Sequence, residues 1–110
     1  MNETIVNAQI ESTMIGYEGH GILSLMIHVS YDGGSASQGY GGYRVDGKDG
    51  FLAESIMGFL RVTDKEQWEN VKGTLVRVKK DGNFGKITAI GHIMKDEWFS
   101  LQELSLAHKS

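Results

Sequence analysis

The sequence GGSASQGYGGYRVDGKDG, residues 33–50, separates a part of the chain with strand patterning from a part with helix patterning. It holds seven of the fifteen glycines of the chain, set among Tyr40, Tyr43 and Arg44. Glycine weakens helices and strands, so this concentration predicts left-handed turns, bulges, or close approach of the backbone to a ligand or another strand. Within this segment, residues 38–45 are expected to form a weak strand.

Two strands are expected before the glycine segment. Residues 4–14 alternate apolar and polar side chains with a period of two, which is typical of a half-buried strand. Residues 22–31 are apolar at both parities, which predicts a central strand covered, at least in part, on both faces.

The periodicity changes after the glycine segment. Apolar side chains in residues 50–62 recur at helical spacing and predict an amphipathic helix. Thr63 and Glu66 have the spacing of a capping box, so a second short helix carrying Trp68 is expected, with Gly73 ending it.

The last third of the chain predicts a β-hairpin followed by a helix. Residues 74–80 and 86–94 are the two strands, and DGNFG at residues 81–85 is the turn. Ser100 and Glu103 repeat the capping-box spacing, which predicts a final helix. We therefore expect one α+β domain over residues 1–110, with an antiparallel sheet of four to five strands and two or three short helices on one face.

Composition excludes several classes of protein. The chain of 110 residues has no cysteine, which rules out disulfides, thiol nucleophiles and thiolate metal sites. No apolar run approaches ~18 residues, so no membrane span is expected, and a cytoplasmic location is predicted. The net charge of −3 gives no general attraction to nucleic acid, and direct binding to it is not expected.

No catalytic or metal signature stands out. Residues 42–48 nearly match a P-loop, but Asp49 stands where the motif needs a hydroxyl to hold Mg²⁺, so we interpret the match as chance. The four histidines, His20, His28, His92 and His108, show no HExxH spacing. A metal site built from His28 and His92, which lie in predicted strands, would lack further ligands. We therefore expect no catalytic residue, no metal and no cofactor.

The candidate contact residues lie mostly in the glycine segment. Arg44 suits a phosphate or carboxylate, Tyr40 and Tyr43 can stack on a base or fill a partner's pocket, and His20 lies between two glycines of a loop. Close approach of the partner would be permitted by the neighbouring glycines, which are Gly39, Gly41 and Gly42.

Two further features have alternative interpretations. The helix start at residues 47–50 would attract anions through its free N–H groups. Capping of this end by Asp46 and Asp49 is the more expected interpretation. The basic run Arg77, Lys79 and Lys80 would place positive charge on one face of the hairpin. That face could contact nucleic acid, although a solvated edge strand is the commoner meaning.

Three stretches together resemble a family of small uncharacterised proteins common in bacteriophage and prophage genomes. They are GHGIL at residues 19–23, GGSASQGYGGYRVD at residues 33–46 and KITAIGHIMKDEWF at residues 86–99. The similarity covers most of the chain. It implies a viral accessory protein that acts by stoichiometric binding, either as an anti-CRISPR inhibitor or as a sponge for nucleotide signals of Thoeris or CBASS immunity.

The expected function is therefore a non-enzymatic, phage-type binding protein that counters host defence inside the host cytoplasm. Its partner would be a defence effector protein or an anionic nucleotide, and a homodimer is the expected oligomer. One alternative is a small nucleotide hydrolase that uses a carboxylate with His20 or His92. Another is a structural or oligomerisation module in which the edge strand of the glycine segment pairs between subunits.

Overall fold

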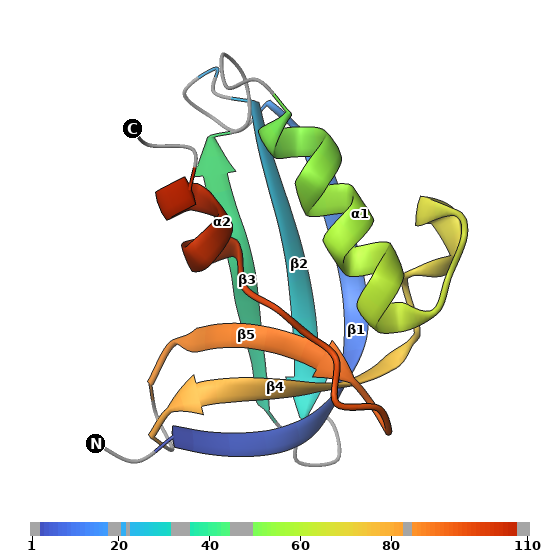
Figure 1. The fold of residues 1–110 in the computed structure, drawn as a ribbon, viewed down its shortest axis with the longest axis vertical. Coiled ribbons are helices and arrows are strands. Elements are labelled where there is room, and N and C mark those ends of the chain that lie inside the picture. Colours follow the sequence, from blue (N-terminus) through green and yellow to red (C-terminus); the bar gives the residue numbers. More distant parts are fainter. Residues whose placement is uncertain are drawn as a thin grey trace.

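The chain folds into a six-stranded antiparallel sheet with two α-helices (Figure 1). The computed structural model describes residues 3–17, 21, 23–31, 36–44, 50–82 and 85–107. In chain order the elements are β1 (Glu3–Tyr17), β2 (Leu23–Tyr31), β3 (Ala36–Arg44), α1 (Phe51–Thr63), a 3₁₀ turn (Trp68–Asn70), β4 (Leu75–Asp81), β5 (Ile87–His92), β6 (Trp98–Phe99) and α2 (Leu101–Ala107). The predicted α+β class is confirmed, with one strand more than expected.

The long strand β1 joins two halves of the sheet, whose strand order is β3-β2-β1-β4-β5-β6. Its first half pairs with β4 and its second half pairs with β2. A bulge after Ile10 lies where the two pairings meet. Bulges bend a strand and increase its twist. The β4–β5 hairpin accordingly crosses the lower ends of β2 and β3 in Figure 1, and the sheet curls around its core.

The core lies between the curled sheet and the two helices. Alternating residues of the strands supply its sheet side, among them Ile27 and Val78, and both are fully buried. Helix α1 adds Phe51 and Phe59, which are also buried. The Phe59 ring meets the Phe99 ring edge-to-face, with 5.2 Å between centroids. Each such fully buried side chain contributes roughly 1.5–3 kcal/mol to stability.

The structure corrects the prediction of a helix capped by Thr63. That residue is the last of α1, and its hydroxyl donates to the carbonyl of Phe59 at 2.7 Å. Only the 3₁₀ turn Trp68–Asn70 follows it. The final helix predicted from Ser100 and Glu103 is confirmed, and Ser100 caps it, because the backbone N–H of Glu103 donates to the Ser100 hydroxyl at 3.2 Å.

The sixth strand, β6, is the element that the sequence did not predict. Strand β5 ends at His92, two residues before the predicted end, and the chain turns back so that β6 pairs with β5. Gly91 makes this pairing possible, since a Cβ there would lie 2.5 Å from a ring carbon of Trp98. Among the described residues, no helix has the length and apolar character needed to cross a bilayer.

Candidate functional site

The glycine segment forms strand β3 with a bulge opposite β2. Leu25 pairs with Tyr43 and Met26 with Gly41, which leaves Gly42 as the extra residue. Gly41 has φ 121°, and a Cβ on it would lie 2.6 Å from the carbonyl oxygen of Leu25. The prediction of a bulge with close backbone approach is therefore confirmed, and the group approached is the neighbouring strand.

Tyr40 is a core residue, with 3% of its surface exposed. Its hydroxyl donates to Oε1 of Gln102 at 2.9 Å and accepts the backbone N–H of Leu101 at 2.7 Å. Its ring meets the Phe59 ring edge-to-face. In this structure Tyr40 joins β3 to α2, and its ring has no open face on which a ligand could stack.

The structure describes the surroundings of only some of the other predicted contact residues. Gly39 lies on the outward side of the sheet, where a Cβ would come within 3.3 Å of the His28 ring. Tyr43 and Arg44 occupy the end of β3, and their side chains, like residue His20, lie outside the part of the chain that the structure describes. Of the predicted anion site at residues 47–50, residues 47–49 also lie outside it, and Gly50, with φ 78°, is the N-cap of α1.

Strand β3 faces the start of β5 across a small cavity of about 200 Å³, to which Gly39, Tyr40 and Gly41 contribute. Two glutamine side chains bridge this seam. Nε2 of Gln38 donates to the carbonyl of Gly85 at 3.2 Å, and Nε2 of Gln102 donates to that of Ile87 at 2.9 Å. The free edge of β3 is therefore held against the β4–β5 hairpin by side-chain amides.

His92 is held by hydrogen bonds at both ring nitrogens. Its Nδ1 accepts the backbone N–H groups of Met94 and Lys95, each at 3.0 Å. Its Nε2 must then carry the hydrogen and donates to Oδ2 of Asp64 at 2.7 Å. Neither nitrogen is left to accept a proton from a substrate.

His28 and His92 do not meet across the sheet. His28 lies on β2 and His92 on β5, and β1 and β4 separate these two strands. Within the described residues, no group of three side chains is placed to hold a metal ion.

The basic run of β4 is divided between the two faces of the sheet. Lys80 is 3% exposed, and its ammonium group donates to the hydroxyl of Tyr31 at 2.8 Å. Arg77 and Lys79 lie on the opposite face and are half-buried. The expected face of three cations therefore contains two.

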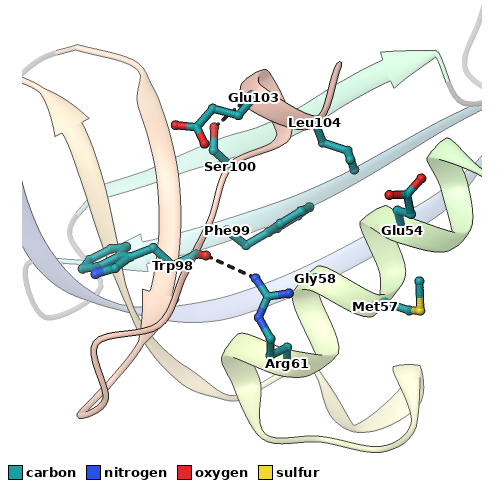
Figure 2. Close-up of a pocket in the computed structure, with 9 residues that line it drawn as sticks. All are labelled: Glu54, Met57, Gly58, Arg61, Trp98, Phe99, Ser100, Glu103 and Leu104. Atoms are coloured by element: carbon teal, nitrogen blue, oxygen red, sulfur yellow. Dashed lines mark hydrogen bonds between the residues drawn. The ribbon is translucent and has the colours of Figure 1, made fainter. Parts of the chain in front are cut away.

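A groove of about 420 Å³ with a mixed apolar and charged lining lies beside α1, as shown in Figure 2. We call it the α1 groove. One wall comes from α1 and the other from β6 and the start of α2; its lining residues are Glu54, Met57, Gly58, Arg61, Trp98, Phe99, Ser100, Glu103 and Leu104.

The floor of the α1 groove is apolar and closely packed. The Phe99 ring lies against Gly58, where a Cβ would come within 2.5 Å of the ring. The Leu104 side chain extends from α2 toward the Phe99 ring (Figure 2). Met57 projects from α1 with 58% of its surface exposed, so a large flexible apolar side chain stands at the mouth of the groove.

Carboxylates surround this apolar floor. Exposed Glu54 and Glu103 stand on its two walls (Figure 2). Arg61 donates to the backbone carbonyl of Trp98 at 3.2 Å and lies 3.8 Å from the carboxylate of Glu97. The principal cation of the groove is therefore already engaged by the protein.

A second hollow of about 460 Å³ adjoins the α1 groove beyond Met57 and Arg61. Its lining includes three carboxylates and one further cation, which are Asp64, Glu66, Glu97 and Lys65. The hydrogen bond from His92, together with the charge of Lys95, lowers the pKa of Asp64 below its ordinary value. Asp64 is therefore ionised at neutral pH, and the two hollows form one acidic surface around Met57.

Comparisons with protein-family models, with curated proteins and with solved structures found no match.

Sequence reasoning missed the α1 groove, although one signal for it was present. Glu54, Met57 and Arg61 follow one another at spacings of three and four, which places them on one face of a helix. That face is the exposed one. A methionine between charged residues on an exposed helix face is a sequence signal for a contact surface.

Proposed function

We propose that this chain is a non-enzymatic binding protein that uses the α1 groove to hold a basic, partly apolar segment of a partner protein. The observation that carries the proposal is exposed Met57 between two hollows whose charged lining residues are mainly carboxylates. Methionine and arginine are enriched in protein interfaces, and apolar anchors near the centre of a contact dominate binding energy.

Charge favours a cationic partner over an anionic one at this site. Among the residues that the structure describes, the two hollows together contain five carboxylates and two cations, Arg61 and Lys65. Arg61 is engaged with Trp98 and Glu97. A phosphate placed here would be repelled, whereas lysine or arginine side chains would be attracted. The protein-inhibitor form of the function is therefore the one we propose for this groove, in preference to the nucleotide sponge.

The family resemblance supplies the biological setting of the proposal. A phage-type protein with an acidic contact surface would act in one-to-one complexes with a basic host defence effector, and effectors that handle nucleic acid carry such basic surfaces. The oligomerisation alternative depends on a free edge of β3. That alternative is less favoured because Gln38 and Gln102 bridge this edge to residues next to or within β5.

Titration calorimetry with a synthetic peptide of alternating leucine and lysine tests the proposal, with a leucine and glutamate peptide as the control ligand. We expect heat of binding from the basic peptide alone. Glu103→Lys should weaken this binding about tenfold, since it reverses a charge on the groove wall. Glu11→Lys changes the net charge equally at an exposed position of β1 and should leave binding nearly unchanged.

Equal weakening by both charge reversals would show that only net charge attracts the peptide, and would contradict the proposal. Absence of binding by the basic peptide to the unmodified protein would contradict it as well. Met57→Ser gives an independent check of the apolar anchor, because this exposed side chain can change without disturbing the core.

A further inference from the structure

The outer face of the sheet carries a second surface, centred on Trp98. Strand β6 turns the Trp98 side chain outward, away from the α1 groove (Figure 2), and the ring lies against Gly91 of β5. Two cations lie over this ring. The ammonium nitrogen of Lys79 is 4.3 Å from the ring centroid, and the guanidinium carbon of Arg77 is 4.9 Å from it. We call these three residues the Trp98 patch.

The groups of the Trp98 patch are held in place by the protein itself. Arg77 donates through Nε to the carbonyl of His92 at 2.8 Å and through Nη2 to that of Lys95 at 2.7 Å. The indole N–H of Trp98 donates to Asp96 at 3.1 Å. A ligand would therefore meet a ring and a guanidinium that are already ordered, which lowers the entropy cost of binding.

Neutral, apolar and acidic residues surround the patch on the same face of the sheet, and the acidic ones include the opposed pair Glu3 and Asp81. The register places Ile5 opposite Lys79, Asn7 opposite Arg77 and Gln9 opposite Leu75. Ile5 and Leu75 are large apolar side chains with 49% and 57% of their surfaces exposed. Between residues 5 and 9 of β1 and residues 75 and 79 of β4 the face is basic and apolar, and Glu3 and Asp81 lie at its end. The carboxylates of the α1 groove lie on the helix side.

We propose that the Trp98 patch binds a nucleobase that carries phosphate, in single-stranded nucleic acid or as a free nucleotide. Lys79 and Arg77 suit the phosphate, and the exposed side chains of Ile5 and Leu75, with the half-buried ring of Trp98, suit the faces of bases. The net charge of −3 had argued against such binding. That argument averages charge over the whole surface, whereas salt screens charges beyond about 10 Å, so the cations close to the ligand matter most.

Fluorescence anisotropy with a dye-labelled oligo(dT) of about 15 nucleotides tests this proposal on the full chain at about 50 mM salt. Lys79→Ala should weaken binding about fivefold. It should also reduce the slope of log binding constant against log salt concentration by about 0.7, which is the contribution of one phosphate contact. Lys72→Ala removes an exposed lysine elsewhere and is the matched control. Trp98→Leu should weaken binding about tenfold by removing the aromatic ring.

Competition with adenosine monophosphate separates the two sources of the ligand. If it displaces the oligonucleotide at concentrations near its own dissociation constant, the site accepts a free nucleotide; if it does not, the site needs several nucleotides. Both results support the proposal when Lys79→Ala weakens binding and Lys72→Ala does not. Equal effects of the two lysine substitutions, or no binding of either ligand, would overturn it.

Discussion

Asp64 ends helix α1 in a left-handed conformation, with φ 58° and ψ 34°. It is the one residue other than glycine with a positive φ in the described part of the chain. Aspartate tolerates this conformation better than most residues, and its side chain gains the bonds to His92 and Lys95 there. The residue that stops α1 therefore also attaches it to the turn between β5 and β6.

The lowered pKa of Asp64 predicts a loss of stability in acid. The folded carboxyl titrates below its unfolded value of about 3.9, so its contribution is present above that value and is lost as pH falls through the folded pKa. Asp64→Asn should remove this part of the pH dependence while keeping a side chain that tolerates the left-handed conformation. Urea unfolding between about pH 5 and pH 2 measures it. Identical pH profiles for the two proteins would contradict the prediction.

We predict that position 58 must be glycine because the Phe99 ring packs against its Cα. Gly58→Ala gains about 1 kcal/mol of helix propensity, but its Cβ would lie 2.5 Å from the ring, so we expect a net destabilisation of about 1–2 kcal/mol. Ala53→Gly at an exposed position of the same helix measures the propensity term alone. Denaturant midpoints give both values. A stabilised Gly58→Ala protein would show that Phe99 moves without cost.

At the scale of elements, helix α2 depends on β3 for its first turn. The Tyr40 hydroxyl accepts the backbone N–H of Leu101, and Ser100 caps the helix from the other side. A helix of this length is not stable alone in water. We infer that β3 positions α2, and with it the wall of the α1 groove that carries Glu103.

Tyr40→Phe should loosen α2 without unfolding the sheet. The substitution keeps the buried ring but leaves the N–H of Leu101 without its acceptor, at a cost of about 1–3 kcal/mol. Hydrogen exchange of the amides in residues 101–107 should speed up more than exchange in β1 and β2. If exchange in α2 is unchanged, the hydroxyl is not what holds this helix.

Periodicity was enough to predict the elements that depend on neighbouring residues. Strands β1 and β2, helix α1, the hairpin and the cap of α2 follow from local patterns. The capping box at Thr63 failed because α1 continues through that residue, whose hydroxyl bonds back into the same helix. Strand β6 was missed because two residues carry no periodicity, and it forms only because Gly91 accepts the Trp98 ring.

At the scale of the whole molecule, the curled sheet brings β3 and β5 together from its two halves. The order β3-β2-β1-β4-β5, with a helix between β3 and β4, is also the connectivity of the OB-fold, a partly open five-stranded barrel. Connectivity by itself assigns no function, because one fold serves many. In this arrangement the single strand β1, bulged after Ile10, pairs with β2 in one half of the sheet and with β4 in the other.

The seam between β3 and the hairpin predicts coupled mutations. Gln38→Ala and Gln102→Ala each remove one bridge, to Gly85 and Ile87 respectively. Once one bridge is lost the seam can part, so the second substitution should cost less than it does alone. We expect an interaction energy of about 0.5 kcal/mol or more in a double-mutant cycle of unfolding free energies. Strict additivity would show that the two bridges act independently.

The distribution of charge was the part of the candidate sites least accessible to sequence reasoning. The net charge of −3 is correct, but it hides the separation between the carboxylates around Met57 and the cations at Trp98. Arg77, Lys79 and Lys80 are close in sequence, and only the pairing of β4 shows that Lys80 points into the core. Such separations arise from which residues share a face of a curled sheet.

Strand β6 has only two residues, and each serves a different surface. The Trp98 ring points outward, and the Trp98 carbonyl accepts a hydrogen bond from Arg61. Its neighbour Phe99 forms the floor of the α1 groove. The peptide unit between Trp98 and Phe99 therefore connects the two proposed binding surfaces. A ligand that tilts this unit at one surface would also change the other surface. If such a tilt occurs, thermodynamic reciprocity requires each ligand to alter the other's affinity by the same factor. The ligands proposed for the two surfaces would then compete or cooperate without touching each other.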